Sequence, residues 1–335
     1  MAILPIFIPH AGCPHQCIFC NQKTISGHSK AAIAYANSQI ERWLQWMKPN
    51  ILNEAAFYGG SFTGLPLGLQ EKLLQLTDKL IAEGFIGSVR LSTRPDYIDV
   101  TRLKLLKKHN VRTVELGVQS LDDRVLQKAE RGHTSQQVIE AMKLLKEKDF
   151  FTGIQLMVGL PMQDFASVKT TGEQVAVLQP DIARIYPVLV IKGTPLAQEY
   201  MSGNYFPLTL EEAVIQSAWL YRRLTQSDIN VIRVGLQADE ELCSPGNILA
   251  GPFHPAMGEL VKSRILRDDC TGKIDFLYEK GLRSVDIYCS YSLESKLRGQ
   301  KNSNLHFWQQ QYPGIQLRII HEKADGIRIC PSANL

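Results

Sequence analysis

Short apolar runs alternate with longer amphipathic stretches along the first two thirds of the chain. Continuous runs of Val, Ile and Leu predict buried strands, and apolar residues at helical spacing predict the helices between them. The expected strands are residues 3–8, 55–58, 89–91, 111–118, 153–158 and 182–190. The expected helices are residues 34–48, 69–81, 99–109, 122–128, 135–148, 164–178 and 211–226. This alternation is typical of parallel strands covered by helices.

Chemically distinctive residues follow the expected strands. They are cysteines after the first strand, Gly59-Gly60 after the second, Thr93-Arg94-Pro95 after the third, Gln119-Ser120 after the fourth and Gly159-Leu160-Pro161 after the fifth. In barrels and half-barrels, the carboxyl ends of the strands form the rim on which active sites are built. We therefore expect an α/β fold, a partial (β/α)6 TIM-type barrel, with its functional site at this rim.

The rhythm of the pattern changes after about residue 230. Residues 231–261 are rich in loop signals, and the tail has strand-like runs at 285–288 and 316–320 with a helix-like piece between them. We expect a core barrel in residues 1–235. Residues 236–335 are expected to form a small C-terminal α+β domain that caps the core and helps to bind substrate.

The composition fits a globular protein with a substantial core, since 44% of the 335 residues are hydrophobic and 21% are charged. The net charge of +4 neither requires nor excludes a nucleic-acid partner. No apolar run approaches the roughly 20 residues of a membrane span. The apolar stretch at residues 3–8 is short, contains Pro5 and lacks a basic start, so it does not resemble a signal peptide. We expect a cytoplasmic protein, not bound to membranes, with reduced thiols.

Three of the seven cysteines lie together in "HAGCPHQCIFCNQ", as Cys13, Cys17 and Cys20. Packed core thiols would follow a strand or helix period, whereas these lie in a polar segment. A closed zinc site needs four ligands, and although His10 or His15 could be the fourth, no second ligand pair follows. Thiolates are the usual ligands of iron–sulfur clusters, and a metal position left open can take a substrate or cofactor. An iron–sulfur cluster is favoured, with zinc and simple packing as alternatives.

Further motifs follow in order: "FYGGSFTGLP", "STRPDYID", "VELGVQSLDDRVL", "RGHT", "LMVGLP" and "IYPVLVIKGTPL". With the cysteine motif, they closely resemble the radical S-adenosylmethionine (SAM) half of the elongator catalytic subunit family and its bacterial relatives, over about residues 3–235. The resemblance implies a [4Fe-4S] cluster on Cys13, Cys17 and Cys20, with SAM bound to the open iron. It further implies reductive cleavage of SAM to a 5′-deoxyadenosyl radical and an electron donor of the flavodoxin or ferredoxin type.

The same resemblance assigns residues that contact SAM. Phe19 matches the aromatic position before the last cysteine. The Gly59-Gly60-Ser61 element matches a Gly-Gly-Glu-like element that meets the SAM amino group through its backbone. Gln119 and Arg131 match contacts to the ribose and the methionyl carboxylate, for which the fork of an arginine is suited.

Two further positions of the resemblance lie on strands. Gln155 lies where relatives have a ribose-binding residue, and Ser92 lies where relatives usually carry Glu. Taken alone, Gln119, Ser120 and Arg131 would each be more typical of ordinary loop hydrogen bonding, and their place in the ordered motifs favours the contacts to SAM. We expect Arg94 to form an ion pair or a phosphate contact, and His133 to be structural, with Thr134 capping the following helix.

Candidates for substrate contacts are Tyr186 and Lys192 near the end of the sixth expected strand, and His254 in "GPFHPAMGEL". For Lys192 a solvated surface charge is an equally good interpretation, and for His254 a structural hydrogen bond is. Cys243, Cys270, Cys289 and Cys330 show no ligand spacing, so no second cluster is expected.

The elongator family joins this core to an acetyltransferase domain and modifies the wobble uridine of tRNA. Among the 100 residues after residue 235 we find no Gly-rich loop of the acetyl-CoA type. We therefore expect a radical SAM enzyme without acetyltransferase activity, with RNA as the leading substrate class and tRNA modification as its role. The alternatives are a radical SAM enzyme that acts on a small metabolite, and a non-catalytic iron–sulfur or zinc protein.

Overall fold

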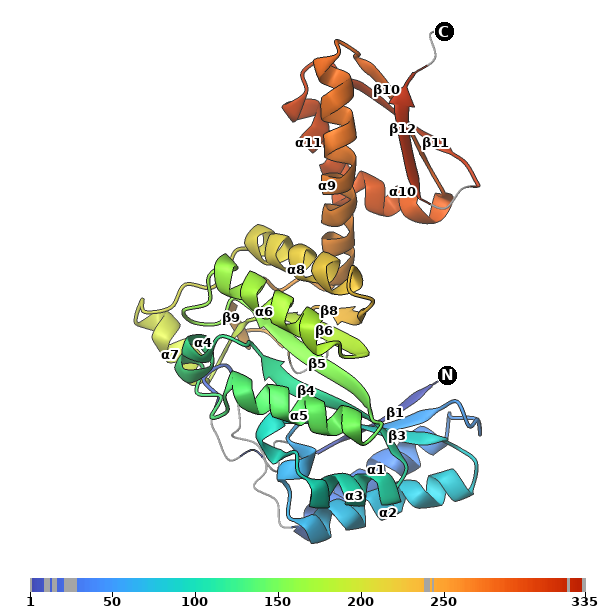
Figure 1. Ribbon diagram of the computed structural model, residues 1–335, viewed down its shortest axis with the longest axis vertical. Coiled ribbons are helices and arrows are strands. Elements are labelled where there is room, and N and C mark those ends of the chain that lie inside the picture. Colours follow the sequence, from blue (N-terminus) through green and yellow to red (C-terminus); the bar gives the residue numbers. More distant parts are fainter. Residues whose placement is uncertain are drawn as a thin grey trace.

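The computed structural model describes residues 2–8, 13, 17–20, 29–237, 242, 244–323 and 326–332. Its main body is a sheet of seven strands in the order β1-β2-β3-β4-β5-β6-β8, and every neighbouring pair is parallel. The sheet curls into a half-barrel whose outer face carries the helices (Figure 1). The predicted α/β half-barrel of the TIM type is confirmed.

The seven strands of this sheet are β1 (Ile3–Phe7), β2 (Glu54–Tyr58), β3 (Ser88–Thr93), β4 (Val111–Gln119), β5 (Phe151–Val158), β6 (Ile182–Pro187) and β8 (Asn230–Val234). The helices between them are α1 (Ser29–Leu44), α2 (Leu67–Ala82), α3 (Val100–Lys108), α4 (Asp123–Lys128), α5 (Ser135–Glu147), α6 (Phe165–Leu178), α7 (Pro195–Met201) and α8 (Leu210–Thr225). Short 3-10 turns follow β2 (Phe62–Gly64) and β3 (Pro95–Tyr97).

Local capping explains where several helices begin. Thr134 precedes α5 in a capping box with Gln137, and Thr209 precedes α8 in a second box with Glu212. Each box satisfies two backbone N–H groups that a helix start leaves without an intrahelical partner. The expected capping role of Thr134 is thus confirmed. The two boxes fix the residues at which α5 and α8 begin.

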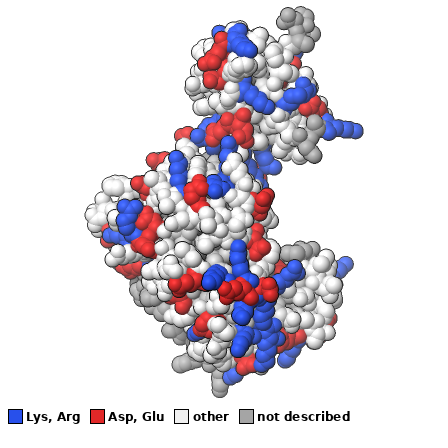
Figure 2. Space-filling view, in the orientation of Figure 1, with Lys and Arg blue, Asp and Glu red and all other residues white. Residues whose placement is uncertain are grey.

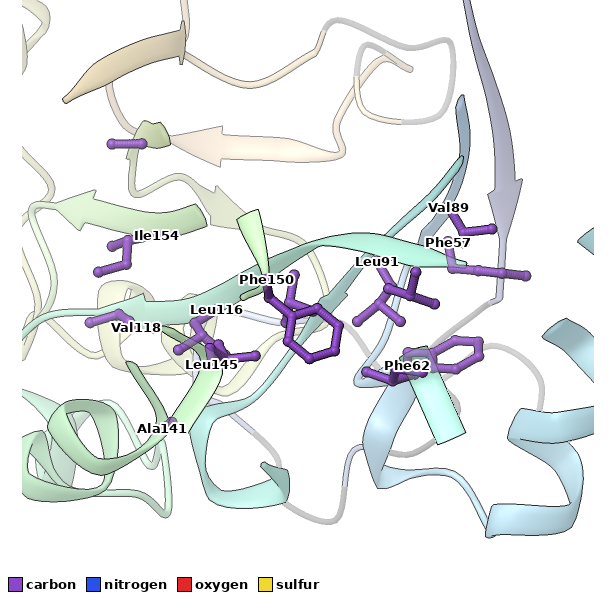
Figure 3. Close-up of a cluster of buried hydrophobic side chains, with 14 of the residues drawn as sticks. Phe57, Phe62, Val89, Leu91, Leu116, Val118, Ala141, Leu145, Phe150 and Ile154 are labelled. Carbon is purple, nitrogen blue, oxygen red and sulfur yellow. The ribbon is translucent and has the colours of Figure 1, made fainter. Parts of the chain in front are cut away.

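The main core lies between the outer face of the sheet and the helices. Figure 3 shows Leu116 and Ile154 from the strands beside Ala141 and Leu145 of α5. The strand residues occupy alternate positions along their strands, and the helix residues share one face of α5. These are the spacings that burial on one side requires.

The first strand is more exposed than its unbroken apolar run suggested. Leu4 and Ile6 are fully buried, but Ile3 and Phe7 keep 38% and 42% of their surface exposed. β1 is the edge strand of the half-barrel, so only one of its faces is covered by helices. The prediction of a buried strand was therefore correct for one face and wrong for the other.

Two further differences concern the end of the half-barrel. The expected strand at 182–190 ends at Pro187, and the chain then forms β7 (Val190–Ile191), which pairs with β9 (Ile248–Ala250) in a separate ribbon. The sheet gains a seventh strand, β8, in the stretch where the apolar rhythm was thought to stop. β8 is short and half-exposed along most of its length, so its apolar signal is weak.

The C-terminal region contains a long helix, α9 (Met257–Glu279), whose first residues lie in the stretch that the sequence had suggested was rich in loops. It leads to a lobe, which we call the C-terminal lobe, at its far end from the half-barrel (Figure 1). The lobe contains a three-stranded sheet in the order β11-β10-β12 with its own hydrophobic core. Its elements are β10 (Ser284–Cys289), α10 (Tyr291–Arg298), a 3-10 turn (Gln300–Asn302), α11 (Ser303–Gln311), β11 (Gln316–His321) and β12 (Ile327–Pro331). The expected small α+β domain is present, with α9 and β12 as unpredicted additions.

A search of the described residues for a helix that is both long enough and apolar enough to cross a membrane finds none.

Candidate cofactor site

The segment with Cys17 and Cys20 is held at the rim by backbone hydrogen bonds. The N–H of Cys20 donates to the carbonyl of Cys17 (2.9 Å), which closes a turn. The N–H of Ile18 donates to the carbonyl of Ala129 (3.3 Å), and the N–H of Leu196 donates to the carbonyl of Ile18 (2.8 Å). The turn is therefore fixed from two sides, by the end of α4 and by the start of α7.

The three predicted cysteine ligands lie close enough together to influence one another's charge. Burial raises the pKa of the Cys13 thiol, although the Ser61 N–H, Arg94 and Arg131 oppose the rise. Burial also raises the pKa of Cys20 to about 12, and the neighbouring Cys17 and Cys13 add to this. The protein alone thus favours the protonated thiols of Cys13 and Cys20, whereas a bound metal removes the proton from a thiol that coordinates it.

In the described part of the chain, no three His, Cys, Asp or Glu side chains converge on the position of a single metal ion. A four-iron cluster asks for a different arrangement, since its ligand sulfurs bind separate iron atoms and lie farther apart. Three neighbouring thiols suit such a cluster. His10 and His15, the possible fourth zinc ligands, lie outside the described residues.

Arg131 connects the cysteine segment to the end of β4. Its Nη1 donates to Cys17 Sγ (3.0 Å) and its Nη2 donates to the carbonyl of Gly117 (2.5 Å). Its guanidinium also lies over the Phe19 ring, 6.0 Å from the ring centre. Two of the residues expected to contact SAM, Phe19 and Arg131, are thus brought to the cysteines.

Gln119 lies beside Arg131 and has a left-handed backbone, with φ of 67°. A β-carbon added to Gly117 would lie 3.2 Å from Gln119 Nε2 and 3.4 Å from Arg131 Nη2, so both side chains pack over this glycine. Gln119 Oε1 and Arg131 Nε are buried with no hydrogen-bond partner among the described residues. Buried polar groups are rarely left in this way, and a bound polar cofactor would satisfy them.

The Gly59-Gly60-Ser61 element packs tightly against the neighbouring strands. Gly59 has φ of 95°, and a β-carbon there would lie only 2.4 Å from the Phe7 ring. The Ser61 hydroxyl is buried and bonds Thr93 Oγ1 (2.9 Å) and the N–H of Arg94 (3.2 Å). The Ser61 side chain is therefore engaged inside the protein, while its backbone N–H bonds to Cys13.

The expected ion pair of Arg94 is present, with Nε donating to Asp96 Oδ1 (2.9 Å) and Nη2 to Asp96 Oδ2 (3.0 Å). Ser92 and Gln155 form a second group, deeper in the half-barrel. Gln155 Nε2 donates to Ser92 Oγ (3.2 Å) and to Glu115 Oε2 (3.3 Å). These two predicted residues are thus joined to each other and to a carboxylate that the motif analysis had not singled out.

The three candidates for substrate contacts do not come together in one group. Tyr186 lies among Arg184, Glu115 and Arg233, and burial raises the pKa of its phenol. Lys192 is exposed just after β7. His254 Nδ1 accepts from the N–H of Ala256 (3.1 Å), a local contact just before α9.

A charged network fills the inner face of the half-barrel. Arg90 Nη2 bonds Glu54 (2.6 Å) and Arg90 Nη1 bonds Glu115 (3.3 Å). Arg184 bonds both oxygens of Glu115, at 2.6 and 3.0 Å. Glu115 reaches Arg184 across β5 because Gly153 leaves room, since a β-carbon there would lie 2.8 Å from Glu115 Cγ. In the sequence, this network was indicated by a charged residue inside each of three apolar strands.

The fold and this rim define a half-barrel protein with a thiol-rich cofactor site. The family model of the Radical SAM superfamily matches residues 7–175, and a second model, the Radical_SAM C-terminal domain, matches residues 180–267. The chain belongs to the radical SAM superfamily.

Within this superfamily the chain is similar to elongator-type proteins. It is 26% identical over 278 residues to the tRNA uridine(34) acetyltransferase of Methanocaldococcus jannaschii, covering 68% of this chain and 51% of that protein. It is 29% identical over 174 residues to Elongator complex protein 3 of Saccharomyces cerevisiae, covering 45% of this chain and 31% of that protein. The chain thus spans about half the length or less of these relatives.

Solved structures agree on the fold. The archaeal Elp3 of Methanocaldococcus infernus matches 84% of this chain and 64% of its own, with a TM-score of 0.61 and 22% identity. Coproporphyrinogen III oxidase from Escherichia coli, described as a radical SAM enzyme, matches 68% of this chain and 52% of its own, with a TM-score of 0.53 and 21% identity.

Proposed function

We propose that this chain is a radical SAM enzyme that holds a [4Fe-4S] cluster on Cys13, Cys17 and Cys20 and binds SAM at the adjacent rim. The observation that carries the proposal is the gathering of the three thiols with Arg131 and Gln119. When bound, the cluster and SAM supply a 5′-deoxyadenosyl radical that abstracts hydrogen from a substrate. A flavodoxin- or ferredoxin-type protein would provide the electron.

The chain's own residues would position these groups. The guanidinium of Arg131 donates a hydrogen bond to Cys17 Sγ and would hold this ligand sulfur in place beside the cluster. The buried Gln119 Oε1 and Arg131 Nε would meet polar groups of SAM. Gly59 lets the backbone of this element pack against the Phe7 ring, and the backbone groups of Gly60 and its neighbours would meet SAM.

We further propose that residues 1–235 form the catalytic core and that residues 236–335 form the C-terminal cap and substrate region. The β7–β9 ribbon supports a covering role for the start of this region, since it joins residues 248–250 to the chain that leaves β6. The C-terminal lobe lies farther away along α9 (Figure 1). A small-metabolite substrate and a non-catalytic metal-binding role are the alternatives that the experiments below separate.

The first test is anaerobic reconstitution with iron and sulfide, followed by dithionite and SAM. We expect 5′-deoxyadenosine from the cluster-loaded protein. Arg131→Gln should retain most of its iron but cleave SAM roughly tenfold to a hundredfold more slowly, because a buried charged hydrogen bond contributes about 1.5–3 kcal/mol. Arg124→Gln, which changes an exposed arginine paired with Asp122, is the control and should cleave SAM normally.

Two results would contradict this proposal. A fully loaded cluster that yields no 5′-deoxyadenosine would exclude SAM cleavage. Zinc at about one ion per chain, without iron or sulfide, would favour a non-catalytic metal protein.

RNA, and tRNA in particular, is the substrate that we propose. The support is the similarity to proteins named for tRNA uridine modification and the basic side chains that gather over α3 in Figure 2. These are Lys104, Lys107 and Lys108, and Lys104 is exposed. When a lysine that contacts an RNA phosphate is neutralised, RNA binding weakens, and the loss does not depend on the base sequence.

The second test measures tRNA binding across a range of salt concentrations. Wild-type affinity should fall steeply with salt, and Lys104→Gln should reduce the slope of log K against log salt by about 1. The matched control is Lys280→Gln. Lys280 lies at the end of α9 and stacks on Phe276. Binding that is absent or insensitive to salt would favour the small-metabolite alternative, and equal slopes for the two variants would contradict a contact at α3.

A further inference from the structure

A cavity of about 520 Å³ lies inside the half-barrel at the end opposite the cysteines. It is lined by the amino-terminal residues of several strands, since Ile3, Glu54, Phe151, Ile182 and Asn230 each begin a strand. We call it the lower cavity. Its size falls in the range of roughly 300–1,000 Å³ that is typical of small-molecule sites. None of the residues expected to contact SAM lines it.

The lower cavity carries more positive than negative charge. Four arginines line it: Arg90, Arg112, Arg184 and Arg233. Arg90 and Arg184 are neutralised by Glu54 and Glu115 in the network described above. Arg112 and Arg233 form no ion pair with any carboxylate of the described residues. Both line the same cavity, Arg112 from the start of β4 and Arg233 from β8, with β5 and β6 between their strands.

The remaining wall is mostly apolar, with Thr113 and Asn230 as its polar members. Phe151, Ile182 and Ile232 line the cavity beside the arginines. A ligand that fits both parts has an anionic end and an apolar body. A phosphate monoester carries close to two negative charges near neutral pH and several acceptor oxygens, which matches two unpaired guanidiniums. A single carboxylate brings only one charge, although an arginine can bind it with two hydrogen bonds.

We propose that the lower cavity binds a small organic phosphate monoester, with the phosphate between Arg112 and Arg233 and the apolar body against Phe151 and Ile182. This site is separate from the rim, and the inference does not depend on the proposed function. The order of the strands supports it: Arg233 of β8 lies in register with Arg184 of β6, so the unpaired and the paired arginine stand side by side.

The test uses the whole chain as purified, without SAM, and calorimetric titration with phenyl phosphate, inorganic phosphate and benzoate. Phenyl phosphate should bind most tightly, because inorganic phosphate lacks the apolar body and benzoate lacks the second charge. The double variant Arg112→Gln with Arg233→Gln should weaken phenyl phosphate binding at least tenfold. Arg124→Gln serves again as the control for loss of one surface arginine. The thermal midpoint of each variant checks that it is folded.

The proposal fails if the wild-type protein binds no phenyl phosphate, or if the folded double variant binds it as well as the wild type does. Tighter binding of benzoate than of phenyl phosphate would overturn the assignment to a phosphate. Because none of these readouts involves SAM cleavage, failure here and failure of the radical SAM proposal are distinguishable.

Discussion

Replacing Cys17 by alanine is expected to abolish both the iron–sulfur cluster and the cleavage of SAM. Cys17 is the most buried of the three thiols, at 5% exposure, and Arg131 donates to its sulfur. The backbone bonds of Ile18 to Ala129 and Leu196 do not involve the Cys17 side chain. The loop should therefore keep its place, and the variant should lose a ligand without losing the fold. Iron and sulfide content, visible absorbance and 5′-deoxyadenosine together measure the effect.

The matched control is Cys330→Ala. Cys330 is half-buried on β12 of the C-terminal lobe, and its replacement should leave iron content and SAM cleavage at the wild-type level. A Cys17→Ala protein that retains a full cluster and cleaves SAM would refute the ligand assignment. Equal losses in both variants would indicate a general effect of removing thiols.

Replacing Glu115 by alanine should produce the largest loss of stability. Glu115 is 1% exposed and joins Arg90, Arg184 and Gln155. Its removal leaves the guanidinium of Arg184, whose side chain is 12% exposed, without its carboxylate, and breaking a largely buried ion pair in this way costs up to about 3–5 kcal/mol. Urea denaturation at neutral pH should show this as a lower midpoint of unfolding with a similar slope.

Glu71→Ala provides the comparison for Glu115. Glu71 pairs with Lys108 at 2.7 Å on the surface, where a single ion pair contributes only about 0–1 kcal/mol. Glu115→Gln should fall between the two, because it keeps the shape and some hydrogen bonds but loses the charge. If Glu115→Ala and Glu71→Ala lower stability equally, the inner network is too well solvated to behave as a buried one.

The fold was predictable from sequence where strands are covered on one face by helices and end in unusual residues. The cysteine segment and Gly59-Gly60 each follow a strand and Gln119 ends one, and parallel strands bring their carboxyl ends to one rim. The structure indeed places Phe19, Gln119 and Arg131 near the cysteines. The contacts between them come from loops distant in sequence, so motif order could indicate them but spacing alone could not.

Other features left little trace in the sequence. Arg90, Glu115 and Arg184 look like interruptions of apolar strands, and their pairing depends on the curvature of the sheet and on Gly153. β8 is half-exposed. α9 contacts the half-barrel at one end and the C-terminal lobe at the other, so its apolar positions face in different directions along its length and do not form one continuous stripe.

Because α9 packs on both bodies, it determines the direction of the C-terminal lobe relative to the half-barrel. Met257 and Val261 pack on α8, whereas Cys270, Ile274 and Leu277 belong to the core of the C-terminal lobe. An α-helix turns roughly 100° and rises about 1.5 Å per residue. The number of residues between Val261 and Cys270 therefore determines which way the lobe faces around the helix axis. A single insertion there would point the lobe in another direction and would separate Ser263 from Asn304 of the lobe or Asp269 from Arg222 of α8.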